Sequence, residues 1–97
     1  MLEQFIAKNP LDAFGRYGLA MECMKEGDLA VAETHFKQLI NTHAEYVAAY
    51  YQYGRMLAAG NRGAEARRVF VEGILRAEQS GEEHARQELQ AALEELG

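Results

Sequence analysis

The stretch that decides the fold runs from Asp28 to Phe70 and reads DLAVAETHFKQLINTHAEYVAAYYQYGRMLAAGNRGAEARRVF. Shifted by 34 residues, the sequence repeats its own pattern of residue classes. The aligned pairs are Tyr17 with Tyr51, Ala20 with Gly54, Ala32 with Ala66, Phe36 with Phe70, and Ile40 with Ile74. A fixed period of about 20–50 residues is the signature of stacked structural repeats. The sequence therefore predicts an all-α protein built from antiparallel helix-turn-helix repeats.

Length and composition are those of one small globular domain. The 97 residues are 48% hydrophobic and 26% charged, and the net charge is −5, which disfavours a general nucleic-acid binder because phosphate contacts need a basic face. A single cysteine cannot form an internal disulfide. The first residues resemble no signal peptide, and no apolar run is long enough to span a membrane. We therefore expect a cytoplasmic protein without membrane or nucleic-acid partners.

Charge is unevenly distributed along the chain. Residues 55–77 carry five arginines against Glu65 and Glu72, a balance of +3, whereas residues 78–97 carry six glutamates against Arg86, a balance of −5. Solvated helix faces explain this better than a basic binding patch does.

The period divides the single predicted domain, residues 1–97, into four parts. Residues 2–9 read as the second helix of a repeat whose first helix is missing, 10–43 as repeat 1, 44–78 as repeat 2, and 81–96 as an amphipathic capping helix. In both full repeats a small residue, Ala32 or Ala66, lies where paired helices cross closely. Gly54 lowers helix propensity by about 1 kcal/mol relative to alanine, so its presence also predicts a close helix contact.

Capping residues predict where the helices begin and end. Asn9 as N-cap with Pro10 at the first position places a helix start near residue 10. Gly27 is suited to end that helix in a left-handed conformation, and Asp28 to cap the next. The spacing of Thr42 and Glu45, and likewise of Ser80 and Glu83, predicts two further helix starts with a capping box.

The repeat pattern resembles that of a known family. The residues that carry the resemblance are Tyr50, Tyr53, Gly54, Leu57, Ala66 and Phe70 and, less closely, Arg16, Leu19, Ala20, Cys23, Ala32 and Phe36. They are similar to the 34-residue signature of the tetratricopeptide repeat (TPR). The sequence departs from it where Arg16 replaces the first aromatic residue and where Ala44 and Glu78 replace the closing prolines. The resemblance implies an α-solenoid with a right-handed superhelix, and a protein-binding adaptor or scaffold.

In TPR-like stacks the first helix of each repeat lines a concave groove. By that resemblance, the groove that binds a peptide or helix of a partner protein comprises Phe14, Tyr17, Met21, Lys25, Tyr51 and Arg55. Aromatic residues, methionine and arginine are common at binding hot spots, and Arg55 would supply a charged anchor. Alternatively, Tyr17 and Tyr51 only fill the joint between helices.

A rival function is self-association as a homodimer. In the truncated first unit Leu2, Phe5 and Ile6 form one apolar helix side, and the helix that would normally cover it is missing. This exposed side predicts a contact between copies of the chain.

The sequence contains no pattern typical of a catalytic, cofactor or metal site. His35, His43 and His84 have no metal-ligand spacing and read as surface residues, and Cys23 reads as buried core filler. The adjacent pairs Glu82-Glu83 and Glu94-Glu95 diverge around a helix and cannot converge as acid and base. The sequence therefore predicts a protein that is not an enzyme and needs no cofactor or metal.

Overall fold

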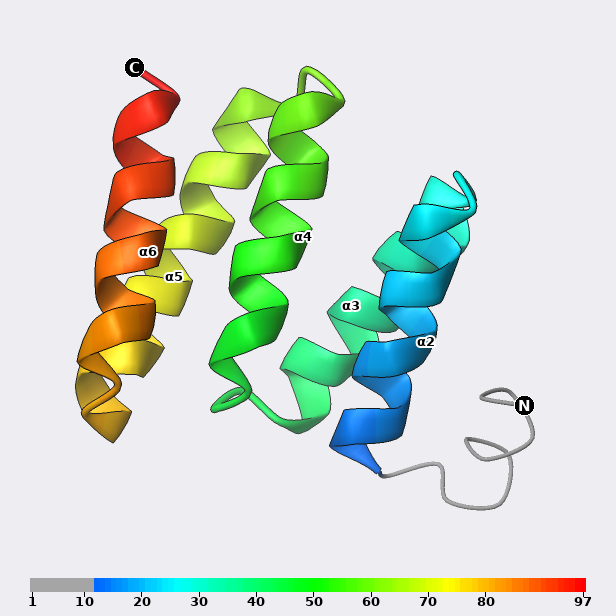
Figure 1. Ribbon diagram of the computed structural model, residues 1–97, viewed down its shortest axis with the longest axis horizontal. Coiled ribbons are helices and arrows are strands. Elements are labelled where there is room, and N and C mark those ends of the chain that lie inside the picture. The colour runs from blue at the N-terminus through cyan, green and yellow to red at the C-terminus, as the bar shows by residue number, and fades with distance from the viewer. Residues whose placement is uncertain (1–11) are drawn as a thin grey trace. The chain divides into compact units, whose positions relative to one another are not determined.

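The computed structural model describes residues 12–97, which form five helices and no strand (Figure 1). The helices are α2 (Ala13–Lys25), α3 (Leu29–Thr42), α4 (Val47–Ala59), α5 (Gly63–Ser80) and α6 (Glu83–Glu95). The all-α, helical-repeat prediction is confirmed. The predicted helix at residues 2–9 lies outside the described residues.

The chain forms two compact units that meet in sequence between Tyr46 and Val47. In the first unit α2 packs against α3, and in the second α4 packs against α5 while α6 packs against both. Short turns join the paired helices, so successive helices within each unit are antiparallel neighbours (Figure 1).

Helix α2 begins at Ala13, so the predicted start near residue 10 is wrong. Asp12 is the N-cap: its backbone is extended, and its Oδ1 accepts a hydrogen bond of 2.6 Å from the backbone N–H of Gly15. This carboxylate satisfies one of the amide groups that have no partner inside the first helical turn. Asn9 and Pro10 lie outside the described residues.

The turn between α2 and α3 follows the prediction in its backbone but not in its cap. Gly27 adopts φ = +85°, the left-handed conformation in which glycine is least strained. Asp28 occupies the N-cap position of α3, but its side chain makes no capping hydrogen bond. Beyond it, Ala32, Phe36 and Leu39 are completely buried. The alanine thus lies in a close helix contact, as the sequence predicts.

Both predicted capping boxes are wrong, because their first residues end one helix instead of starting the next. Thr42 is the last residue of α3, and its hydroxyl donates to the carbonyl of Gln38 at 2.8 Å. Ser80 is the last residue of α5, and its hydroxyl donates to the carbonyl of Arg76 at 3.0 Å. Each hydroxyl bonds back to the carbonyl four residues earlier in its own helix, a common alternative to capping for serine and threonine.

The core of the second unit is built on two close approaches at glycines of α4 and α5. A Cβ added to Gly54 would lie 2.3 Å from Cε1 of Phe70, so the Phe70 ring occupies the space that a side chain would need. A Cβ added to Gly73 would lie 2.6 Å from Cβ of Tyr50 and 3.1 Å from Cδ2 of Leu89. The close contact predicted at Gly54 is confirmed. The one at Gly73 is a finding of the structure.

Helix α6 is amphipathic, as predicted for a capping helix. Leu89 is fully buried, and the other apolar residues on its side of the helix are half-buried, namely Ala85, Ala92, Leu93 and Leu96. The opposite side is exposed and acidic, with Glu83, Glu88, Glu94 and Glu95. In Figure 1 this helix lies along α5, whose Gly73 accommodates Leu89.

Candidate functional site

The predicted binding residues of α2 form a line along one side of that helix. Phe14 is 76% exposed, Met21 is half-buried and Lys25 is exposed. Their spacing of seven and four residues places them on one side of a helix with 3.6 residues per turn. Leu19 and Ala20 are buried on the other side, so packing against α3 fixes which way this line faces.

Tyr17 lies beside that line and packs within the first unit. Its ring centroid is 5.3 Å from that of Tyr46, and the two rings are tilted by 41°. Burial, followed by the neighbouring Tyr17 and Asp12, raises the pKa of the Tyr46 hydroxyl above its ordinary value. Tyr17 remains half-buried, so it both packs and keeps an accessible edge.

Sequence reasoning missed the part that Tyr46 plays. The residue lies in the turn after α3, and the 34-residue period pairs it with Asp12 and Ser80, so no aromatic repeats at that position. A second contact that it missed holds the same hairpin together. The Arg16 guanidinium donates to the Gln38 side-chain oxygen and lies 3.1 Å from Nδ1 of His35. His35 is therefore part of a polar contact between α2 and α3.

On α4 the predicted residues are held by the packing of that helix in the second unit. Tyr50, Tyr53 and Leu57 are buried, which directs positions 51 and 55 away from the core. Tyr51 is half-buried, and the guanidinium carbon of exposed Arg55 lies 5.4 Å from the centre of its ring. Such a cation–π contact contributes about 0.5–1 kcal/mol at an exposed site. It orients the guanidinium while its N–H groups remain accessible to a partner.

Arg55 makes no ion pair with any residue from 12 to 97. An arginine offers five N–H donors in a planar fork that matches a carboxylate. Arg55 can therefore receive an acidic group of a partner without first breaking an ion pair within the described part of the chain.

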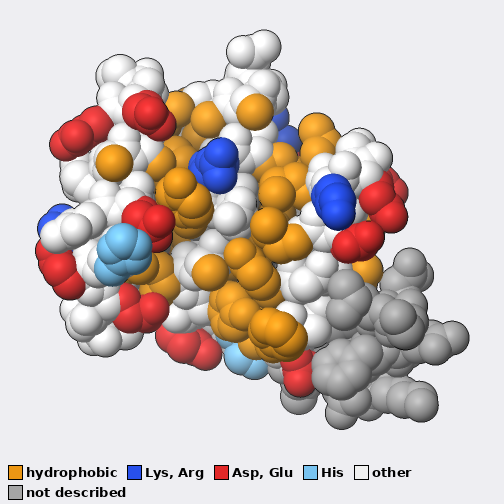
Figure 2. Space-filling view, viewed as in Figure 1, with side chains coloured by type: hydrophobic (Ala, Val, Ile, Leu, Met, Phe, Trp, Pro, Cys, Tyr) orange, Lys and Arg blue, Asp and Glu red, His pale blue; other side chains and the backbone are white. Residues whose placement is uncertain are grey.

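In the view of Figure 1, α2 lies in front of α3, and α4 lies in front of α5. In the space-filling view of Figure 2, hydrophobic side chains are exposed among scattered charged ones. One half of the predicted site belongs to the first unit and the other half to the second. The predicted self-association residues Leu2, Phe5 and Ile6 lie outside the described residues, and that contact stays a prediction.

Residues 12–97 contain no group of three or more histidine, cysteine, aspartate or glutamate side chains that could hold a metal ion. Cys23 is half-buried, so it is less enclosed than the core residue that the sequence predicted. Of the three histidines, His84 is exposed, whereas His35 and His43 are half-buried. No helix in the described part of the chain is both long enough and apolar enough to cross a membrane.

Comparison with known proteins places the chain among helical repeat proteins. No family model matches the chain. It is 27% identical over 95 residues to a TPR repeat-containing protein of Pseudomonas aeruginosa, an alignment that covers 98% of this chain and 90% of that protein. A protein of Bordetella parapertussis with 23% identity has the same fold, with a TM-score of 0.83 over 98% of this chain and 83% of that one.

The tetratricopeptide repeat domain protein of Salinibacter ruber is 32% identical to this chain. Its solution structure gives a TM-score of 0.84 and covers 88% of this chain and 86% of that one. Its crystal structure gives a TM-score of 0.82 with 88% and 94% coverage. Identity at this level over nearly the whole of both chains, together with the 34-residue period, shows that the chain belongs to the tetratricopeptide repeat family.

Proposed function

We propose that this protein is a protein-interaction module whose α2 and α4 bind an apolar or aromatic peptide segment, or a helix, of a partner protein. The proposed contact residues are Phe14, Tyr17, Met21, Lys25, Tyr51 and Arg55. In this role the protein is an adaptor or scaffold of the cytoplasm, and no residue is assigned a catalytic part. Membership of a family of interaction modules supports the general role.

The observation that carries the proposal is the exposure of Phe14. A phenylalanine ring that is 76% exposed leaves a large apolar surface in water, and Met21 extends that surface along the same side of α2. Removing this apolar surface from water lowers the free energy, so a partner that covers it binds favourably. Methionine adapts its shape to different apolar partners because its side chain is unbranched and flexible.

The charges beside these apolar residues suggest what else the partner carries. Lys25 ends the α2 line, and Arg55 stands over Tyr51 on α4, so both faces combine an apolar surface with a cation. The ligand that fits is a segment in which an aromatic or aliphatic residue lies close to an aspartate or glutamate.

A displayed library of random peptides tests this proposal without knowledge of the natural partner. We expect the selected peptides to be rich in aromatic and acidic residues. Fluorescence anisotropy with one labelled peptide should then show that Phe14→Ala and Arg55→Ala each weaken binding about tenfold or more, the loss expected at an interface hot spot.

The matched control is Arg68→Ala, which removes an exposed arginine from α5. It should leave peptide affinity unchanged. If Phe14→Ala and Arg55→Ala bound the peptide as tightly as the wild type, and circular dichroism showed unchanged helicity, the binding surface would lie elsewhere.

A further inference from the structure

Helix α5 exposes an apolar pair on the side that faces away from its own core. Val71 is 51% exposed and Leu75 is 44% exposed, and they lie one helical turn apart. Phe70, Gly73 and Ala77 are buried on the opposite side, so the contacts with α4 and α6 leave Val71 and Leu75 uncovered. This outer face of α5 is distinct from the α2 and α4 residues proposed to bind a peptide.

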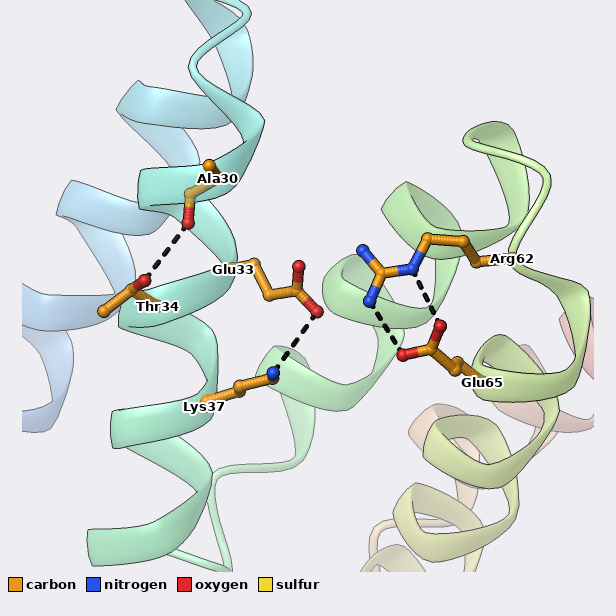
Figure 3. A network of polar contacts seen from close by, with 6 residues as sticks. All are labelled: Ala30, Glu33, Thr34, Lys37, Arg62 and Glu65. Carbon is orange, nitrogen blue, oxygen red and sulfur yellow. Dashed lines mark hydrogen bonds and ion pairs between the residues drawn. The ribbon is translucent and has the colours of Figure 1, made fainter.

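Two of the arginines in and beside α5 are neutralised by glutamates close to them in sequence. Arg62 donates two hydrogen bonds of 2.8 and 2.7 Å to the carboxylate of Glu65 (Figure 3). Arg76 donates one hydrogen bond of 2.9 Å to Glu72. These pairs engage two of the five arginines of residues 55–77, and Arg55, Arg67 and Arg68 keep the net charge of that segment at +3.

The remaining charges lie on the outer face itself. The Arg67 guanidinium donates to a main-chain oxygen of Gly97 at 3.1 Å. Arg68 makes no hydrogen bond or ion pair with any residue from 12 to 97. The Glu78 carboxylate also lacks such a bond there, although its charge reaches Arg86 at longer range. A cation and an anion therefore lie near opposite ends of the face without a partner in the described structure.

These four side chains form an antisymmetric pattern about Gly73. Val71 and Leu75 lie two residues before and after it, and Arg68 and Glu78 lie five residues before and after it. With a rise of about 1.5 Å per residue, the members of each pair are about 3 Å and about 7.5 Å from the centre along the axis. At 3.6 residues per turn, all four lie within about 40° of one line along the helix.

We propose that this outer face binds the same face of a second copy of the chain, with the two α5 helices antiparallel. A twofold axis at Gly73 brings Arg68 of each copy to the level of Glu78 of the other. Val71 and Leu75 of one copy then lie against Leu75 and Val71 of its partner. The contact is self-complementary and closes as a dimer, because each patch meets its own equivalent.

The order of the charges favours a second copy over other occupants. An anionic membrane or a uniformly acidic peptide would attract Arg68 but would place negative charge against Glu78. The occupant must present an anion, an apolar pair and a cation in the reverse order, and the face itself provides that sequence. One pair of helices buries a small area, typical of weak and transient complexes, so we expect a dissociation constant between about 1 μM and 1 mM.

Sedimentation velocity of the full chain, from about 1 μM to 1 mM, tests the dimer directly across that affinity range. The wild type should shift from monomer to dimer. Arg68→Glu and Glu78→Arg should each weaken dimerisation about tenfold, because each substitution turns two attractive pairs into two repulsive ones.

The decisive measurement mixes these two single variants in equal amounts. In the mixed pair one copy carries glutamate at both positions and the other carries arginine at both, so every contact joins opposite charges. The mixture should form a heterodimer under conditions where neither variant forms a homodimer. The double variant with both substitutions should also recover the dimer.

Two control variants separate this dimer from other contacts. Arg55→Glu on α4 and Phe5→Glu in the N-terminal segment should both dimerise like the wild type. The proposal would be overturned if the wild type stayed monomeric at every concentration, or if either single variant dimerised like the wild type. It would also be overturned if the mixture of the two variants stayed monomeric, or if Phe5→Glu lost the dimer. Peptide binding should be unaffected by Arg68→Glu, so the two proposals can fail independently.

Discussion

Replacing Gly54 by alanine should destabilise the protein even though alanine is the better helix former. The new Cβ would lie 2.3 Å from Cε1, 2.6 Å from Cδ1 and 2.8 Å from Cζ of Phe70. Phe70 is only 1% exposed, so its ring is enclosed and can yield only by moving its neighbours or by separating α4 from α5. The substitution therefore overpacks the contact between these two helices.

The expected loss follows from two opposing terms. Overpacking a well-filled core typically costs about 1–3 kcal/mol, and so short a contact belongs near the upper end of that range. The gain in helix propensity from glycine to alanine offsets about 1 kcal/mol. The net decrease in the free energy of unfolding is then about 2 kcal/mol, which lowers Tm by about 8–16 °C in a domain of this size.

Urea and thermal unfolding followed by far-ultraviolet circular dichroism measure this decrease. Gly63→Ala is the matched control, because a Cβ at Gly63 would meet no atom within 4 Å. It lies at the first position of α5 and should stabilise the protein by up to about 1 kcal/mol, since alanine restricts the unfolded chain. The same chemical change should thus have opposite signs at the two glycines.

Replacing the Phe70 ring by a smaller side chain should relieve its clash with an alanine at position 54. Phe70→Leu alone destabilises by leaving a cavity, but combined with Gly54→Ala the total loss should be smaller than the sum of the two single losses. An alanine at position 54 that leaves stability unchanged or increases it would refute the close approach of α4 and α5. Additive losses would show that the strain does not involve Phe70.

Three further predictions concern single side chains. Hydrogen bonds from Arg86, followed by Gln87, lower the pKa of the Glu83 carboxyl from 4.5 to about 2. Deprotonated Glu83 therefore stabilises the fold above pH 4.5, and this contribution is lost as the pH falls toward 2. Carbon NMR titration should show a pKa near that value, and Arg86→Gln should return it toward 4.5. Asp12→Ala should cost about 1 kcal/mol in urea unfolding, whereas Asp28→Ala, which removes no capping hydrogen bond, should cost much less. Ultraviolet titration of the wild type and of Tyr46→Phe should show that the tyrosine lost in the variant has a pKa above 10.0.

The arrangement of residues around the repeat could be predicted because it recurs. Ala32 and Ala66 are both 0% exposed, and Phe36 and Phe70 are buried beside them at the same offset. Because the pattern appears twice, with small residues at equivalent positions, it predicts from the sequence alone where the helices cross. Gly54 could be interpreted in the same way, because a glycine inside a helix needs a compensating contact.

Helix ends were harder to predict because several hydrogen bonds of similar strength compete there. Thr42 and Ser80 can cap a following helix or satisfy a carbonyl of their own helix, and sequence spacing permits both. The structure places both hydroxyls on their own helix. Likewise Asp12, not Asn9, provides the cap of α2, because the chain is still extended at residue 12.

Some features of the candidate site could be predicted from the sequence, and others could not. Helical spacing alone put Phe14, Met21 and Lys25 on one side of α2, and Tyr51 and Arg55 on one side of α4. Their environments could not be inferred from spacing, because they depend on residues outside the period. Tyr46 provides the ring against Tyr17, and α6 provides Leu89 against Gly73.

By itself, the sequence determined the fold class, the family, the order of the helices and the faces that they bury. These properties depend on the spacing of residues along one helix and on a period that occurs twice. The tertiary structure alone decided that Gly73 makes room for Leu89 and that Arg55 stacks on Tyr51. It also decided that Val71 and Leu75 stay uncovered on α5. Such properties depend on which side chains of neighbouring turns and helices fill the same space, and a linear pattern does not contain that information.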